Sequence, residues 1–158
     1  MAEPLIDRMM GSIREAGRLY HRLILLVSPA GTGKTMALRQ IQERLSVPLI
    51  NVNLELSQRM LSLSERQQTL ELPRLLAEVV NASGSDPVLL DNIEILFDVS
   101  LKQNPLRLLQ AMSRNKTVVA TWNGYINGEQ VVYATPDHPE YRQYPVRDFL
   151  AVSRDDVA

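Results

Sequence analysis

The sequence predicts an α/β fold, a three-layer sandwich in which helices cover both faces of a mostly parallel β-sheet. An apolar run at 23–27 stops at a glycine-containing loop, and an amphipathic segment at 36–45 follows the loop. Two further apolar runs, 88–90 and 117–122, are each followed by a polar side chain, Asp91 and Asn123. Strands that alternate with helical segments are typical of parallel sheets.

Composition and length limit the class of protein. The chain has 158 residues, which is typical of one domain with a layered core. Its net charge of -1 offers no broad attraction to nucleic acid or to an anionic membrane. The sequence has no cysteine, which excludes disulfides, thiolate zinc sites and a cysteine nucleophile. No apolar run approaches the roughly 20 residues of a membrane-spanning helix, so we expect a soluble, cytoplasmic protein without membrane contact.

The loop at 28–35, Ser-Pro-Ala-Gly-Thr-Gly-Lys-Thr, matches the phosphate-binding pattern G-x-x-x-x-G-K-[ST] except that Ser28 replaces the first glycine. Backbone N–H groups of such a loop surround phosphates, the Lys34 ammonium reaches the β- and γ-phosphates, and the Thr35 hydroxyl binds Mg²⁺. An ordinary strand-to-helix turn is the alternative, but the flanking strand and helix favour a Walker A loop. The predicted nucleotide-binding residues are Pro29, Ala30, Gly31, Thr32, Gly33, Lys34, Thr35 and Met36.

A second motif is the short apolar strand Val88–Leu90 that ends in Asp91. A buried strand that ends in a carboxylate is what a Walker B site requires, so Asp91 is predicted to bind magnesium together with Thr35. The alternative is an aspartate that caps the strand or its turn.

The next residue is Asn92, where many hydrolysing P-loop ATPases have a glutamate that activates water. An amide can orient water but cannot accept its proton at neutral pH. Glu94 can replace that glutamate if the turn directs it inward, and otherwise it is a solvated residue at the start of a helix.

Three further residues are candidates for contact with the terminal phosphate. Asn123 follows the strand 117–122, at the edge of an open sheet where ligands bind, although Asn123-Gly124 also fits a tight turn without a ligand. Arg142 and Arg147 are candidates for an arginine that senses the γ-phosphate of a neighbouring subunit. Most surface arginines have no such role.

The remaining elements follow from periodicity and capping signals. We expect an N-terminal helix from Pro4 within residues 1–22, with Leu5, Met9, Ile13, Ala16 and Tyr20 on its apolar stripe. The core, 23–123, should also contain a strand at 49–56, a polar segment at 57–70 that is helical or mobile, a helix beginning at Pro73 and a helix opened by Asn104-Pro105. The C-terminal part, 124–158, should form a hairpin at Asn127-Gly128 with a return strand at 130–134, and a last strand at 145–152.

The succession of Walker A loop, intervening strand, Walker B strand and Asn123 resembles the core of AAA+ and related ASCE-type P-loop NTPases over 23–123. The resemblance implies Mg-ATP binding, with Lys34 and Thr35 in the Walker A roles, Asp91 in the Walker B role and Asn123 as sensor one. Ser28 and Asn92 depart from the family pattern. The sequence leaves no room for the C-terminal helical lid of full AAA+ proteins.

The segments SPAGTGKT, VLLDNIEILF, VVATWNG and HPEY also resemble the BrxF family of small P-loop proteins from bacteriophage-exclusion (BREX) defence systems. This resemblance implies a role in anti-phage defence within a multi-protein machine, together with other BREX defence proteins that act on DNA. We also expect a homo-oligomer. Because the net charge is near zero, we expect any DNA contact only through an assembly that gathers the locally basic region 102–116 of several chains. Three functions are open at this point: an ATPase completed by oligomer or partner contacts, a nucleotide-gated assembly module with little hydrolysis, and a small P-loop kinase. A kinase needs a lid, for which the polar segment 57–70 is the candidate.

Overall fold

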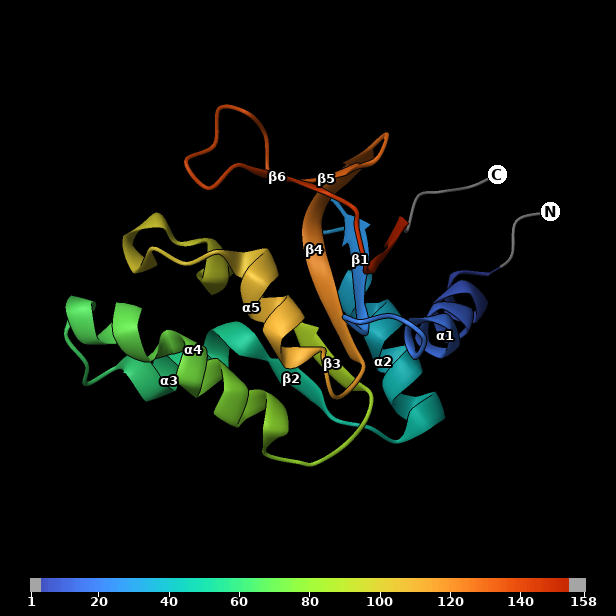
Figure 1. Ribbon diagram of the computed structural model, residues 1–158, viewed down its shortest axis with the longest axis horizontal. Coiled ribbons are helices and arrows are strands. Elements are labelled where there is room, and N and C mark those ends of the chain that lie inside the picture. The colour runs from blue at the N-terminus through green and yellow to red at the C-terminus, as the bar shows by residue number, and fades with distance from the viewer. Residues whose placement is uncertain (1–3, 154–158) are drawn as a thin grey trace.

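The computed structural model describes residues 4–153, which form a twisted seven-stranded sheet with helices on both faces (Figure 1). Five strands form a parallel sheet in the order β2-β3-β4-β1-β7. The end of β4 forms an antiparallel hairpin with β5, and β6 pairs antiparallel with β5. The elements are α1 (Leu5–Ala16), β1 (Leu23–Ser28), α2 (Lys34–Leu45), β2 (Leu49–Asn51), α3 (Val52–Met60), α4 (Glu65–Asn81), β3 (Val88–Asp91), the 3-10 helices η1 (Glu94–Phe97) and η2 (Val99–Leu101), α5 (Pro105–Met112), β4 (Val118–Asn127), β5 (Gln130–Tyr133), β6 (Arg142–Pro145) and β7 (Leu150–Ser153).

Two apolar cores lie on the two faces of the sheet, which confirms the predicted three-layer sandwich. Every residue of β1 is buried, and because side chains alternate along a strand, Leu25 faces one core and Leu26 the other. Helices α3, α4 and α5 cover the first core, and α1 and α2 cover the second. In α1 the predicted stripe is correct up to Ala16, but Tyr20 lies beyond the helix and is 58% exposed.

The predicted strand at 49–56 is wrong beyond Asn51. The Asn51 side chain accepts a hydrogen bond from the Leu54 backbone N–H at 3.0 Å and caps α3. The buried residues that follow, Val52, Leu56 and Met60, are spaced four apart, as one helical face requires. A spacing of four residues also fits the alternation that predicted a strand, so the apolar pattern alone does not distinguish a strand from a helix. The Asn51 cap favours the helix.

The predicted helix start at Pro73 is also wrong, because α4 begins at Glu65 behind a capping box formed by Ser64 and Gln67. Pro73 therefore lies inside the helix and cannot donate to the carbonyl of Thr69. The Gln103 side chain donates to that carbonyl instead, at 2.9 Å. This substitute bond explains how the helix continues through a proline, and the polar segment 57–70 is mostly helical.

After the parallel sheet, β4 continues into the hairpin rather than turning at Asn123-Gly124, so the tight-turn alternative is wrong. Asn123 is the last β4 residue paired with β1, opposite Ser28, and Gly124 is the first paired with β5, opposite Tyr133. The hairpin at Asn127-Gly128 is confirmed. The predicted last strand, 145–152, is too long: its strand β7 begins only at Leu150, and Pro145 is the last residue of a separate strand, β6.

Gly124 is predicted to be essential for the hairpin, because a Cβ built there would lie 1.7 Å from the Val132 carbonyl oxygen. We expect Gly124→Ala to lower the free energy of unfolding by about 3 kcal/mol, the upper end of overpacking costs. Urea unfolding followed by circular dichroism measures this. Gly11→Ala is the control, because its Cβ would meet nothing closer than 3.8 Å and alanine favours the helix. Equal stability of the two variants would contradict the prediction.

Two structural features bear on the wider predictions. Among residues 4–153 no helix follows α5. Within the same range, none of the helices is both long enough and apolar enough to cross a bilayer.

Candidate functional site

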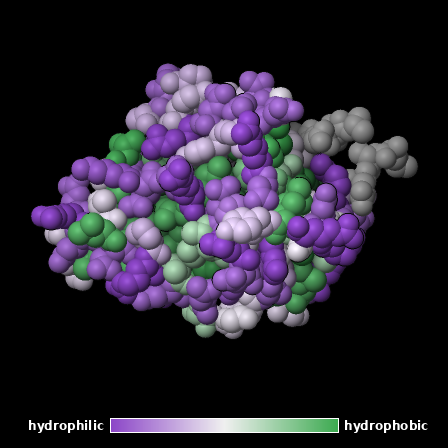
Figure 2. All heavy atoms as spheres, viewed as in Figure 1, coloured by the Kyte–Doolittle hydropathy of each residue, from purple (hydrophilic) through white to green (hydrophobic). Residues whose placement is uncertain are grey.

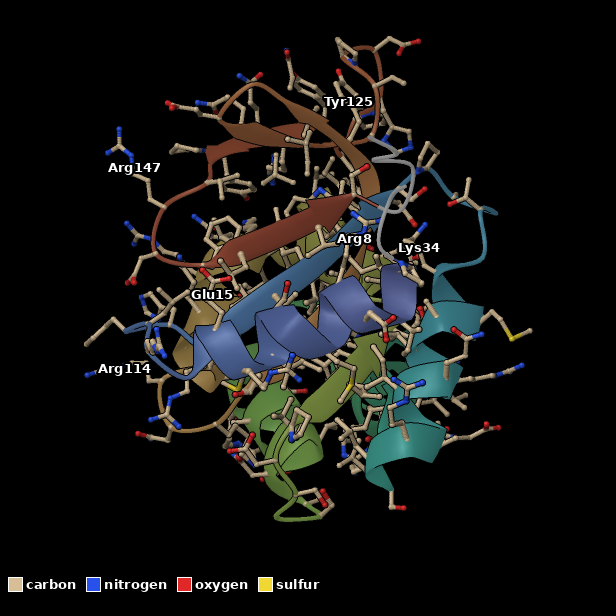
Figure 3. The ribbon with its side chains drawn as sticks, turned by 90° about the vertical axis from the view of Figure 1, so that its right-hand side faces the viewer. Arg8, Glu15, Lys34, Arg114, Tyr125 and Arg147 are labelled. Carbon is tan, nitrogen blue, oxygen red and sulfur yellow. The ribbon has the colours of Figure 1, made fainter. Side chains whose placement is uncertain are left out.

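The candidate site lies at the carboxyl edge of the parallel sheet, where β1 and β3 end and β4 leaves the sheet for the hairpin. The strand order brings together the residues at these three positions, Ser28, Asp91 and Asn123. The chain leaves β1 through the loop 29–33 and enters α2 at Lys34, which Figure 3 shows close to the end of that strand. Open α/β sheets bind their ligands at this edge.

The loop 29–33 has the backbone shape that an anion site requires. Gly31 and Gly33 adopt left-handed conformations, with φ of 78° and 87°, and Gly33 is the N-cap of α2. The first N–H groups of α2 therefore face the loop together with the positive end of the helix dipole. Ser28, the departure from the glycine pattern, contributes a contact of its own, because its hydroxyl lies 2.6 Å from the Thr32 hydroxyl.

The Lys34 side chain is almost fully buried, at 6% exposure, and its ammonium is held inside the loop. Nζ donates to the carbonyl oxygens of Ser28 at 2.9 Å and of Pro29 at 2.8 Å. A buried ammonium needs such oxygen partners to offset its lost hydration. The charge is thus directed to the concave side of the loop, where phosphate oxygens would be bound.

Asp91 is buried and connects three elements. Its Oδ2 accepts a hydrogen bond from the Thr35 hydroxyl at 2.5 Å, and its Oδ1 accepts from the Thr121 hydroxyl at 2.9 Å and from the Asn92 backbone N–H at 3.0 Å. Sequence analysis missed Thr121, although a hydroxyl within the apolar strand 117–122 was a signal. Thr121 fixes the rotamer of the carboxylate.

The residues present fit a magnesium ion. Thr35 Oγ1 and Asp91 Oδ2 are neighbouring hard oxygen donors, and Mg²⁺ typically takes one or two protein oxygens and fills its other positions with water and substrate phosphates. Residues 4–153 contain no group of three His, Asp or Glu side chains that could hold a metal by themselves. The site therefore suits an ion that binds together with a phosphate chain.

Beyond Asp91 the chain turns inward. Asn92 adopts a left-handed conformation with φ of 53°, and its carbonyl accepts from the Asn53 N–H at 2.9 Å. This turn starts η1 at Glu94, whose Oε1 accepts a hydrogen bond from Asn123 Nδ2 at 2.7 Å. Glu94 is half-buried, so the inward orientation, rather than the solvated one, is observed.

These side chains share one cavity of about 150 Å³. It is lined by the loop residues Ala30, Gly31 and Gly33 and by the polar candidates Lys34, Thr35, Asp91, Asn92, Glu94 and Asn123. Pro29, Thr32 and Met36 do not line it, although Pro29 and Thr32 hold the loop. Arg142 and Arg147 are absent from its lining, and Figure 3 places Arg147 on the side of the molecule opposite Lys34. Their predicted role toward a neighbouring subunit stays a prediction.

A larger cavity of about 450 Å³ adjoins the first and shares Ala30, Glu94 and Asn123 with it. Tyr133 on its wall is buried and stacks on Phe97 of η1, with ring centroids 3.5 Å apart. Burial, with Glu94 and Glu140 nearby, raises the pKa of Tyr133 far above its usual value, partly offset by a hydrogen bond with the Asn123 side chain. The hydroxyl is therefore neutral and contacts Asn123, a connection that sequence analysis missed.

For a nucleotide that is bound and hydrolysed at this edge, we predict that Tyr133→Phe lowers turnover about fivefold without changing nucleotide affinity, because it removes the hydroxyl beside Asn123 and keeps the ring stack. A net hydrogen bond of about 1 kcal/mol corresponds to that factor. Steady-state kinetics and calorimetry measure the two quantities. Tyr125→Phe, on the exposed wall of the same cavity, is the control, and equal turnover of both variants and the wild type would contradict the prediction.

The fold and this edge define a P-loop nucleotide-binding domain. The sequence model of the ATPase family associated with various cellular activities (AAA) matches residues 24–134. The chain belongs to this AAA family, whose members typically bind the nucleotide together with Mg²⁺. The match supports a nucleotide-binding ATPase domain. A search of curated proteins finds no significant match.

Proposed function

We propose that the protein binds Mg-ATP and hydrolyses it at the cavity beside Lys34. The observation that carries the proposal is the contact of the Thr35 hydroxyl with the buried Asp91 carboxylate next to an inward-directed ammonium. The loop N–H groups and Lys34 would bind the β- and γ-phosphates, and Thr35 and Asp91 would hold Mg²⁺. The bound ion would neutralise phosphate charge that develops during the reaction.

In this proposal Glu94 is the general base and Asn123 positions it. Water attacks the γ-phosphorus and gives its proton to Glu94, the bond from water oxygen to phosphorus forms, and the bond to the β,γ-bridging oxygen breaks. The products are ADP and inorganic phosphate. Glu94 supports this role because it reaches the cavity and can accept a proton, which Asn92 cannot.

A second candidate is a nucleotide-gated switch that assembles on ATP and hydrolyses it slowly. Asn92 favours it, because the residue directly after the Walker B aspartate is an amide and the carboxylate two residues later already accepts a hydrogen bond from Asn123. The kinase alternative loses its predicted lid. Arg59 in the segment 57–70 pairs with Glu55 at 2.7 Å, and no residue of that segment lines either cavity.

The broader role we propose is that of a homo-oligomeric component of a BREX-type defence complex, together with other BREX proteins. The support is the resemblance of the four segments noted above. Deleting the gene from a host with an active BREX system should raise phage plating, and complementation with wild type but not with Lys34→Ala should restore resistance. Unchanged plating after deletion would remove this part of the proposal and leave the ATPase proposal in place.

The direct test measures phosphate release over a series of protein concentrations, with mass-based sizing in the presence and absence of Mg-ATP. Turnover per chain that rises steeply with concentration supports hydrolysis completed between subunits. ATP-dependent assembly without phosphate release supports the switch. Absence of any nucleotide binding by folded protein in calorimetry would refute both.

A further inference from the structure

The edge of the sheet opposite the candidate site carries five cationic side chains from three connecting segments, here called the basic edge: Arg18, Arg22, Arg114, Lys116 and Arg147. The Arg22 N–H donates to the Ser113 carbonyl at 2.7 Å, and the Val118 N–H donates to the Arg22 carbonyl at 2.9 Å. Arg147 precedes β7, which pairs with β1 from Ile24 onward. In Figure 3, Arg114 and Arg147 both project from the side away from Lys34.

These cations are accessible to solvent. Arg18, Arg114 and Arg147 are exposed, and Arg22 and Lys116 are partly exposed. Within residues 4–153 none of the five forms an ion pair, whereas Arg44, Arg59 and Arg74 on other surfaces do. The carboxylates that neighbour the basic edge in sequence or pairing are Glu15, Asp86 and Asp148, and Asp86 is occupied by the Thr117 N–H at 3.0 Å.

One of the cations is also held in place. The Arg114 guanidinium lies over the Tyr20 ring, 4.7 Å from its centroid, and the Tyr20 ring packs edge-to-face on His21. Such a cation–π contact already restricts the rotamers of the arginine, so the side chain loses less conformational entropy when it binds an anion. The exposure of Tyr20, which contradicted its predicted place in the apolar stripe, thereby acquires a structural reason.

We propose that the basic edge binds the phosphodiester backbone of nucleic acid without reading its sequence. Arginine matches phosphate in geometry, and four of the five cations are arginines. Of the large apolar side chains exposed in residues 4–153, Tyr20 belongs to this edge, and the Arg114 guanidinium lies over its ring. The cores of protein interfaces and membrane-bound helices need more apolar surface than that.

From a net charge of -1 we expected DNA contact only through an assembly that gathers the region 102–116 of several chains. A single chain gathers these cations because the amino ends of β1, β4 and β7 meet at one edge. The proposal is independent of nucleotide hydrolysis, since none of its residues lines the cavity at the opposite edge.

The test is fluorescence anisotropy with a labelled 20-nucleotide DNA strand and with the corresponding duplex. We expect dissociation constants of about 10⁻⁴–10⁻⁶ M near physiological salt. For the single strand, the logarithm of the association constant should fall with the logarithm of the salt concentration at a slope of about -3.5, which corresponds to five phosphates neutralised by the five cations. The double variant Arg18→Glu/Arg147→Glu should weaken binding at least tenfold. Its matched control is Arg39→Glu/Arg66→Glu, which makes the same charge change at exposed positions on α2 and α4. Thermal melts verify that both variants are folded.

Three results would overturn the proposal: no binding at low salt, equal weakening by the control pair, or a salt slope near zero. Vesicles containing anionic lipid provide a competition arm. If vesicles bind the basic edge and DNA does not displace them, the partner is a membrane surface instead.

Discussion

Lys34→Ala is expected to abolish measurable ATP hydrolysis, with a loss of about 10²–10³ in turnover, because it removes a preorganised donor to the transferred phosphate. Nucleotide affinity should fall as well, because the variant removes a positive charge that two loop carbonyls hold beside the phosphate-binding position. Phosphate release and calorimetric titration with Mg-ATP measure the two effects.

Lys116→Ala is the matched control for this variant, because it removes an ammonium at the opposite edge of the same sheet. It should leave turnover and ATP affinity unchanged. Retained hydrolysis in Lys34→Ala would mean that the loop does not bind the triphosphate, and the proposed function would then fail as a whole.

Glu94→Gln is expected to lower turnover by about 10²-fold or more while ATP affinity stays within a fewfold of wild type, since general base catalysis contributes factors of this size. The amide oxygen can still accept the hydrogen bond from Asn123, so the geometry of the cavity should be kept. The ATP-bound state should therefore accumulate, which sizing and rapid-filtration binding would detect.

Glu140→Gln is the control for this second variant, because Glu140 lines the larger cavity but not the smaller one. Full turnover in Glu94→Gln would exclude Glu94 as the base. Together with ATP-dependent assembly, that result would favour the nucleotide-gated switch, which needs no general base at Asn92 or Glu94.

The phosphate-binding loop could be predicted from the sequence because its determinants are local. The glycines at 31 and 33 permit the left-handed conformations, the apolar run 23–27 forms the buried strand before them, and the amphipathic segment 36–45 forms most of the helix after them. The position of Asp91 beside this loop was predictable for the same reason, since a short buried strand ends at its carboxylate.

The local errors arose where two local signals compete. Residues 49–56 have apolar side chains at every second position, which predicted a strand, but Val52, Leu56 and Met60 also have the spacing of four that a helix requires, and the Asn51 cap favours the helix. Pro73 has the signal of a helix start, yet Gln103, which follows η2, satisfies the carbonyl that the proline leaves unpaired. Such distant partners cannot be inferred from a single segment of sequence.

The sequence by itself therefore determined the α/β class, the loop 28–35 and the strand that presents Asp91, because each depends on conformational preferences within a few residues. Only the tertiary structure decided that Glu94 turns toward Asn123, that Thr121 and Tyr133 support the site, and that the cations of the basic edge gather on one side. The physical reason is strand order: neighbours across a parallel sheet come from segments far apart in the chain, so their side chains meet only after folding.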